Sequence, residues 1–371
     1  MKKILIILGV LFVSQVFAQE YIPFDNNLQM KFDNNLRYDK IVKLGDQTLL
    51  KTYRYNPKIR RDVYTFYDYK NDTISTEFIV RDSCETISIA ENDKNYYCLI
   101  RNKIAVELLQ TSKKRINWKT IYTINDVEKD NYDLMISNKR IVILSNSRLY
   151  YKFKNKFKIQ SFNDTWMTRY NRIYYNHAFS YFLGDMLFIA NDRGEFGGKL
   201  LRFQYDKRKD NFTYVEMIND NVKKIVLYKN ELYAISLLEH MSLMYNTLYK
   251  INGDSIYTVY SQNNFNNSNN NLNNMKIDWY NWKDIVSGFP ILSIETYNNS
   301  LYILIRKKGI YKLSENNNLE LVKPLDVDRY FTGHDGKISY SVRDIILNLQ
   351  AIEGSLYLIH NVPIITKVGL K

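Results

Sequence analysis

The chain repeats one short phrase, which is clearest at residues 299–304, where the sequence reads Asn-Ser-Leu-Tyr-Ile-Leu. A small polar turn comes first, followed by an apolar residue, an aromatic residue and further apolar positions. The same order returns at 147–150, 184–189, 230–235 and 354–359. A strand-like pattern that returns at this spacing indicates a β repeat architecture.

The aromatic or equivalent position marks each unit of the repeat. These positions are Tyr150, Phe188, Tyr233, Tyr302 and Tyr357. Residues 47–50 and 95–100 occupy comparable places further upstream. Together they indicate about seven units with a period of about 50 residues.

Each unit also contains other strand-like segments around the phrase. A second alternating segment follows it, as at 199–203, 247–251 and 309–313, and an apolar run such as 222–227 or 291–296 precedes it. Four short strands per unit, repeated around an axis, is the plan of a β-propeller. We therefore predict an all-β fold, a β-propeller of about seven four-stranded blades. Six or eight blades, or paired β-sandwiches, are the alternatives.

With these repeated phrases the chain resembles secreted β-propeller repeat proteins in general. The resemblance covers most of the chain and implies blades stacked around a central axis. The sequence lacks the Asp-box of sialidases, WD dipeptides and the repeated double glycine of kelch blades. The resemblance therefore implies no particular activity.

The N-terminus has the order of a secretory signal peptide. Lys2 and Lys3 precede an apolar run at 4–13 and the small-residue end at 16–18. This predicts a signal peptide over 1–18, cut between Ala18 and Gln19, and export to the periplasm or the cell exterior. Residues 19–371 are predicted to form a single propeller domain without a transmembrane anchor, with an Asn-rich loop insertion at 262–275.

The two cysteines, Cys84 and Cys98, flank an apparent hairpin. In an oxidising compartment this arrangement favours a structural disulfide, and two buried free thiols are the alternative. Neither their number nor their spacing favours a metal site, and the sequence predicts no cofactor.

The formal charge is +13, from 52 basic and 39 acidic residues. Such a surplus favours anionic partners. The alternative is that the positive charge reflects the overall composition, in which Lys is abundant together with Asn, Tyr and Ile. The lysines would then lie on solvated surfaces without contacting a ligand. Basic residues between 54 and 61 alternate with tyrosines and could contact nucleic acid, but an exported protein rarely meets that ligand.

The first candidate binding site is the segment 192–198, which combines three glycines with Asp192, Arg193 and Glu195. Glycines allow the backbone to approach a ligand closely, and the charged side chains could hold a sugar or a cation. A plain loop between strands is the alternative.

Trp279 and Trp282 form the second candidate site, directly after the Asn-rich stretch. Exposed indole rings flanked by polar groups suit stacking on sugar rings, whereas buried packing of both tryptophans is the alternative.

His334 is the third candidate, within the segment Gly-His-Asp-Gly at 333–336. In a hydrolase this histidine would have to meet a carboxylate or a serine from another blade, and the alternative is a polar turn. No pair of acids or nucleophile stands out, so no catalytic residue is named and a non-enzymatic role is favoured.

These patterns predict an exported binding or interaction module for a glycan or protein partner at the cell envelope. A polysaccharide hydrolase or lyase on a propeller scaffold is one alternative. An inhibitor or immunity-like protein that caps an acidic partner is another, because the chain is basic.

Overall fold

In the computed structural model, the described backbone comprises residues 20–22, 36–44, 47–54, 61–68, 73–75, 81, 84–125, 132–137, 140–145, 148–153, 156–161, 176–192, 198–240, 243–263, 290–315, 318–325, 330–335, 338–343, 346–352, 355–360 and 365–369. The predicted signal peptide over 1–18 lies outside these residues. The predicted loop 262–275 begins inside a strand that runs to Asn263, and the rest of it lies outside the described residues.

The described strands form seven four-stranded antiparallel sheets, each of which is one blade. Blade 1 consists of β2 (Leu36–Leu44), β3 (Gln47–Arg54), β4 (Arg61–Asp68) and β5 (Thr73–Ser75). Blade 2 consists of β6 (Glu85–Glu91), β7 (Asn95–Arg101), β8 (Val106–Ser112) and β9 (Arg115–Ile124). Blade 3 consists of β10 (Asp133–Ile136), β11 (Ile141–Leu144), β12 (Arg148–Phe153) and β13 (Lys156–Ser161). Blade 4 consists of β14 (Asn176–Leu183), β15 (Met186–Asp192), β16 (Gly198–Asp206) and β17 (Asn211–Ile218).

Blade 5 consists of β18 (Val222–Tyr228), β19 (Glu231–His240), β20 (Leu243–Asn252) and β21 (Ser255–Asn263). Blade 6 consists of β22 (Ile291–Tyr297), β23 (Ser300–Ile305), β24 (Gly309–Leu313) and β25 (Leu319–Lys323). Blade 7 consists of β28 (Ile346–Ile352), β29 (Ser355–His360), β30 (Ile365–Val368) and β1 (Glu20–Ile22). A two-stranded hairpin, β26 (Tyr330–Asp335) and β27 (Ile338–Arg343), lies between blades 6 and 7 in the chain.

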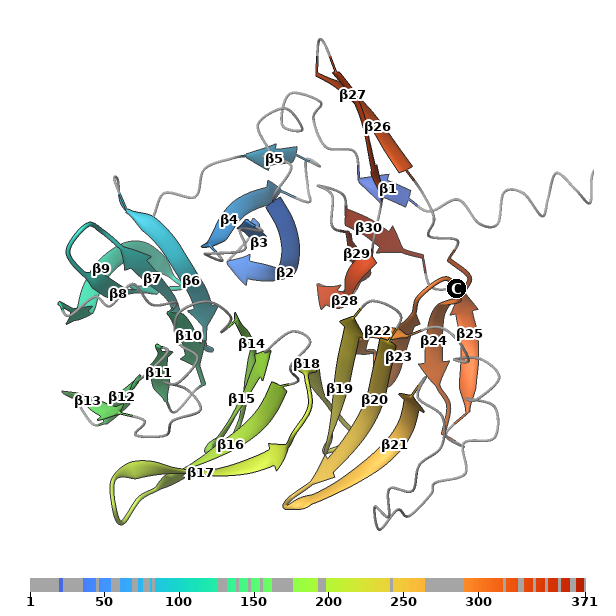
Figure 1. Ribbon diagram of the computed structural model, residues 1–371. Helices are drawn as coiled ribbons and strands as arrows, with labels where there is room; N and C mark the ends of the chain where they lie inside the picture. The colour runs from blue at the N-terminus through green and yellow to red at the C-terminus, as the bar shows by residue number, and fades with distance from the viewer. Residues whose placement is uncertain are drawn as a thin grey trace, which may run out of the picture.

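The blades close into a ring (Figure 1). Each inner strand contacts the inner strand of the next blade, in the order β2, β6, β10, β14, β18, β22 and β28, and β28 contacts β2. The outer strand of blade 7 is β1, whose Tyr21 pairs with Thr366 of β30. The predicted propeller of about seven four-stranded blades is therefore confirmed.

One of the repeated phrases lies on a different strand from the others. In blades 5, 6 and 7 the phrase begins the second strand, but residues 148–150 belong to β12, the third strand of blade 3. The second strand of that blade is β11, an apolar segment without an aromatic residue. Tyr150 and Phe188 therefore lie on a third and a second strand, so the interval between them in the sequence is shorter than the period of the repeat.

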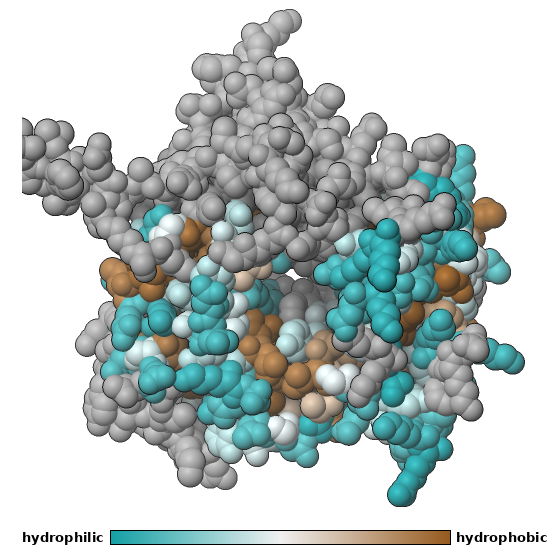
Figure 2. All heavy atoms as spheres, turned by 180° about the vertical axis from the view of Figure 1, so that it is seen from behind, coloured by the Kyte–Doolittle hydropathy of each residue, from teal (hydrophilic) through white to brown (hydrophobic). Residues whose placement is uncertain are grey.

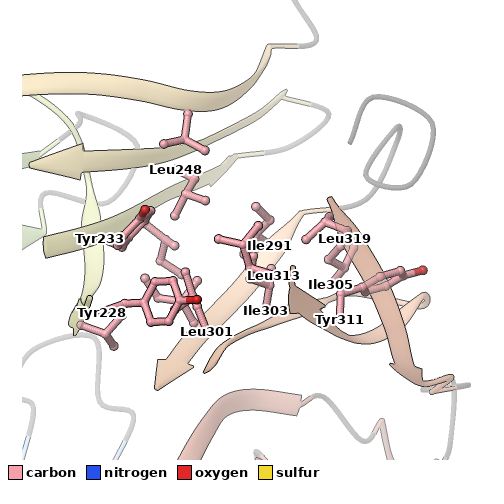
Figure 3. Packing of buried hydrophobic residues seen from close by; sticks show 14 residues of the cluster. Tyr228, Tyr233, Leu248, Ile291, Leu301, Ile303, Ile305, Tyr311, Leu313 and Leu319 are labelled. Carbon is pink, nitrogen blue, oxygen red and sulfur yellow. The ribbon is translucent and has the colours of Figure 1, made fainter. Parts of the chain in front are cut away.

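Among the described side chains, the core lies between the blades, because the sheets of blades 2 to 7 bury their faces against their neighbours. Leu301 and Tyr302 follow one another on β23, yet Leu301 packs between blades 5 and 6 and Tyr302 between blades 6 and 7. Side chains alternate between the faces of a strand, so one phrase supplies both interfaces. Figure 3 shows the first of these clusters, in which Tyr233 and Leu248 of blade 5 meet Leu301 and Ile303 of blade 6. Burying each such side chain contributes about 1.5–3 kcal/mol.

Among the described residues, no helix has the length and apolar character needed to cross a membrane.

Candidate functional site: the top face and the polar belt

The strand order assigns every connection to one of two faces of the ring. We call the face at which the inner strands begin the top face, and the face at which they end the bottom face. In an antiparallel blade the second strand ends at the top face, the third begins there and the outer strand ends there. Connections from second to third strands, and from one blade to the next, therefore lie at the top face.

All three predicted binding segments follow strands that end at the top face, although Figure 1 shows the β26–β27 hairpin projecting outward from the ring. Asp192 is the last residue of β15, and the chain returns at Gly198, the first residue of β16. The stretch with Trp279 and Trp282 connects β21 to β22, and His334 is on β26, between blades 6 and 7. Arg193, Glu195, Trp279 and Trp282 lie outside the described residues, and only the backbone of Asp192 and His334 is described.

Most inner strands contain a β-bulge close to their first residues, and so close to the top face. The irregularity falls between Tyr38 and Lys40, Thr86 and Ser88, His177 and Phe179, Val222 and Lys224, Ile291 and Ser293, and Ile346 and Asn348. A bulge bends the strand and re-aims the side chain that follows it. In blades 2, 5, 6 and 7 the residue that follows the bulge is polar, and its side chain bonds to a neighbouring inner strand.

These polar residues form what we call the polar belt. Its members are Ser88, Asp133, Lys224, Ser293 and Asn348, where Asp133, opposite Leu144, takes the matching position at the start of β10. Each comes from a different blade, and their contacts form two halves, one joining blades 2 to 4 and the other joining blades 5 to 7.

Lys224 is the centre of one half of the belt. Its Nζ atom donates to Oε2 of Glu295 at 2.8 Å, to Oδ1 of Asn348 at 3.0 Å and to the carbonyl oxygen of Leu349 at 2.6 Å. Only 14% of the Lys224 side chain and 17% of the Glu295 side chain are exposed. This one ammonium group therefore ties blade 5 to blades 6 and 7.

Ser293 completes this half of the belt, because its hydroxyl donates to Oδ1 of Asn348 at 2.6 Å. Burial and the nearby Glu295 carboxylate raise the pKa of Tyr181, which extends the cluster electrostatically to blade 4. A buried charge pair of this kind is stable only when further hydrogen bonds satisfy it, and the amide and carbonyl oxygens around Lys224 do so.

Asp133 is the centre of the other half. Its Oδ1 atom accepts from the Ser88 hydroxyl at 2.9 Å and from the Leu134 amide at 2.9 Å, and its Oδ2 atom accepts from the Ser180 hydroxyl at 3.3 Å. Ser88 belongs to blade 2 and Ser180 to blade 4. One carboxylate thus connects three consecutive blades.

A second polar cluster lies at the top face between blades 4 and 5. Asp220 sits in the connection from β17 to β18, and its carboxylate accepts hydrogen bonds from Ser236 and from the Tyr249 hydroxyl, the latter at 2.8 Å. Burial and the adjacent Asp220 carboxylate raise the pKa of Tyr249. The cluster fixes the path by which the chain enters blade 5.

Asn246 performs a similar task between blades 5 and 6. Its buried side-chain amide accepts from the Ile291 amide at 2.8 Å and donates to the Ile291 carbonyl at 3.1 Å. A side-chain amide that pairs twice with one residue replaces a missing rung of β-sheet. It anchors the first residue of β22, immediately after the segment that contains Trp279 and Trp282.

The two cysteines are free thiols in the structure. Cys98 pairs in register with Ile89, and Thr86 pairs with Ile100, so the Thr86–Ile100 rung separates Cys98 from Cys84, which precedes β6. No disulfide joins them in this arrangement, in which Cys98 is buried and Cys84 is partly exposed, and the predicted bridge stays a prediction. Burial raises the pKa of both thiols.

The polar belt was not predicted from the sequence. Its signal is a lone polar residue within an apolar run, such as Lys224 in 222–227 or Ser293 in 291–296. Alternation along the strand does not show which face of the sheet these side chains occupy, because a bulge shifts the alternation by one residue. Within the described part of the chain, no three His, Cys, Asp or Glu side chains are grouped in a way that could hold a metal ion.

Comparison with known proteins shows similarity in structure and none in sequence families. No protein-family model matches the chain, and no curated protein matches it in sequence. A structure of YCF48 bound to D1 peptide is similar at 7% identity and a TM-score of 0.49, covering 91% of this chain and 93% of that one. The β-propeller domain of the trilobed protease from Pyrococcus furiosus is similar at 8% identity and a TM-score of 0.47, covering 91% and 95%. BamB from Moraxella catarrhalis is similar at 9% identity and a TM-score of 0.43, covering 88% and 92%.

Proposed function

We propose that this chain is an exported binding module that recognises a glycan or protein partner at the cell envelope through its top face. The observation that supports the proposal is that the segments with Asp192 and with Trp279 both connect strands whose ends lie at the top face of one closed ring. A rigid scaffold that presents several connecting segments on one face is a common arrangement for binding sites.

The polar belt supports this role because its hydrogen bonds hold neighbouring blades together close to the top face. Lys224 and Asp133 of the belt each connect neighbouring blades close to the starts of the inner strands, and Asn246, outside the belt, does the same between blades 5 and 6. A binding surface assembled from several blades requires that these blades do not shift against one another. We therefore assign the belt a positioning role beneath the binding surface.

A binding role also fits the described carboxylates better than the hydrolase alternative does. Asp133 and Glu295 are each held by hydrogen bonds to neighbouring groups, Asp133 by two hydroxyls and Glu295 by Lys224 and the Thr296 amide. A general acid requires a carboxyl group that can bind and release a proton at the substrate. Carboxylates engaged between blades are better suited to joining the blades.

The proposal is tested with residues 19–371 on a glycan array and against fractionated cell-envelope proteins. The variants are Trp279→Ala/Trp282→Ala and Asp192→Ala/Arg193→Ala/Glu195→Ala at the top face. The matched control is Asp254→Ala/Glu315→Ala, at bottom-face turns where these side chains are 85% and 92% exposed.

We expect the wild type to bind a defined glycan or protein, and at least one top-face variant to lose about tenfold or more in affinity. The bottom-face control should bind like the wild type. Equal binding by all variants, or loss only in the control, would overturn the proposal.

A further inference from the structure

The bottom face is charged unevenly around the ring. The turns between third and outer strands lie at this face, and in blades 2 to 4 they are basic. Lys113 and Lys114 form the turn from β8 to β9, Lys156 begins β13, and residues 207–209 read Lys-Arg-Lys in the turn from β16 to β17. In blades 5 and 6 the same turns carry Asp254 and Glu315 instead.

The outer hairpins of blades 2 to 4 form one continuous surface. The ring of Tyr122 on β9 stacks on Phe157 of β13, with centroids 4.0 Å apart and an interplanar angle of 15°. On the other side of β13, the Gln160 side chain accepts from the Phe212 amide at 2.9 Å and donates to the Phe212 carbonyl at 2.8 Å. Figure 1 shows the outer strands of these three blades following one another from the left-hand edge of the ring to its lower edge.

The turn from β16 to β17 is held rigidly in this surface. Oδ1 of Asp206 accepts from the Arg208 amide at 2.8 Å and from the Lys209 amide at 3.3 Å. Asp210 has a positive φ of 53° and is bound by Lys158 and by the Tyr205 hydroxyl. The two acidic residues are thus occupied in shaping the turn, while the side chains between them extend into solvent.

We call the exposed basic side chains of this surface the basic rim, which consists of Lys114, Lys156, Lys158, Lys207, Arg208 and Lys209. Lys158 is engaged by Asp210. The other five have no acidic partner among the residues that the structure describes. Their charge is therefore available to a ligand outside the chain.

We infer that the basic rim docks the protein on an anionic lipid surface. The basic groups end at one face of three neighbouring blades and do not converge on a single point, so a small anion could contact only a few of them. An extended layer of negative headgroups can contact all of them at once. Each basic residue near such a surface raises partitioning about fivefold, and the attraction fades over about 10 Å.

Docking through the basic rim leaves the opposite, top face directed away from the lipid. Figure 2 shows one side of the molecule, on which hydrophilic and hydrophobic residues are interspersed. Electrostatic binding at the surface of a membrane does not require apolar side chains to enter the lipid. The described basic turns accordingly have only polar and charged residues at their tips. The inference is independent of the proposed function, because the two use different faces.

The test is co-sedimentation of residues 19–371 with vesicles of phosphatidylcholine alone and of phosphatidylcholine mixed with phosphatidylglycerol. The test variant is Lys207→Glu/Arg208→Glu/Lys209→Glu. The control is Lys103→Glu/Lys307→Glu/Lys308→Glu, which makes the same change in net charge at top-face turns of blades 2 and 6. Circular dichroism establishes that both variants are folded, and Lys114→Gln/Lys156→Gln serves as a milder second variant.

We expect binding to the phosphatidylglycerol vesicles only, a loss of binding at high salt, and a decrease of about tenfold or more in the rim variant but not in the control. Equal losses in both triple variants would assign the binding to net charge and overturn the inference. Binding to soluble dextran sulfate without binding to vesicles would also overturn it, because the rim would then select a linear polymer.

Discussion

Lys224 and Glu295 join two neighbouring blades by a contact of 2.8 Å between Nζ and Oε2. The two residues are far apart in the sequence and belong to different sheets. Both side chains are largely buried, and Asn348 of a third blade accepts from the same ammonium group. The inner strands of blades 5, 6 and 7 are thus fastened by polar contacts as well as by apolar packing.

Replacing Lys224 by Met should destabilise the protein by about 3 kcal/mol, because the Glu295 carboxylate then stays buried without its partner. Denaturation by urea measures the loss. The double variant Lys224→Met/Glu295→Gln should recover part of it, since no uncompensated charge remains. Lys229→Met, at a side chain that is 54% exposed, is the control and should change stability by less than about 0.5 kcal/mol. A loss below about 1 kcal/mol for Lys224→Met would contradict the importance given to the belt.

Gly309 should not tolerate a side chain. Its φ is 131°, and an added Cβ would lie 2.9 Å from Cα of Pro324 and closer still to the Lys323 carbonyl oxygen. We expect Gly309→Ala to cost at least about 2 kcal/mol in thermal or chemical unfolding. Gly253→Ala is the matched control, because Gly253 also has a positive φ but nothing within 4 Å, so only about 1 kcal/mol of backbone strain is expected. Equal losses at both positions would show that the close approach of β24 to β25 is unimportant.

The protein should lose stability in strongly alkaline solution. Burial is the main factor that raises the pKa of Tyr233 and of Tyr260 to about 12. A phenol with a raised pKa in the folded state stabilises the fold below its unfolded pKa of about 10, and this contribution is lost as the pH rises toward the folded value. The urea midpoint should therefore fall between about pH 10 and about pH 12. Tyr233→Phe removes one of these titrations and should flatten the decline, whereas an unchanged slope would contradict the assignment.

Reaction with a thiol reagent distinguishes two free thiols at Cys84 and Cys98 from a disulfide between them. Cys98 is fully buried and burial raises its pKa, so it should not react with a thiol reagent in the native protein. Cys84 is partly exposed and should react slowly. After unfolding without reductant, two thiols should titrate, the same number as in a reduced sample. No titratable thiol under those conditions would mean that the disulfide forms after all.

The repeat and the blade plan were predictable from the sequence, because the Leu-Tyr phrase must bury its two side chains on opposite faces of a strand. Leu232 and Tyr233 do so between blades 4 and 5 and blades 5 and 6, respectively. The phrase at 147–150 predicts a second strand but forms the third, since β11 has only aliphatic residues and the aromatic pair Tyr150 and Tyr151 comes one strand later. Local pattern could not separate these neighbouring strands.

The polar belt was beyond sequence reasoning for a different reason. Lys224 reads as an ordinary solvated lysine in a basic chain, and the next residue along the belt, Ser293, is 69 positions away. A β-bulge changes which face a side chain occupies, and its place in these strands follows from pairing between strands. The predicted segments around Trp279 and His334 could be located on a face only after the order of strands in each blade was known.

The pairing of β1 with β30 completes blade 7 and so joins the N-terminal strand to the last blade of the ring. The most direct measurement is disulfide trapping of residues 19–371 with Tyr21→Cys/Thr366→Cys, at positions paired in register between β1 and β30. Under mild oxidation we predict an intramolecular cross-link between positions 21 and 366, identified by peptide mass mapping. Failure of this cross-link in folded protein, or linkage of position 21 to another cysteine, would contradict a ring closed by the N-terminal strand.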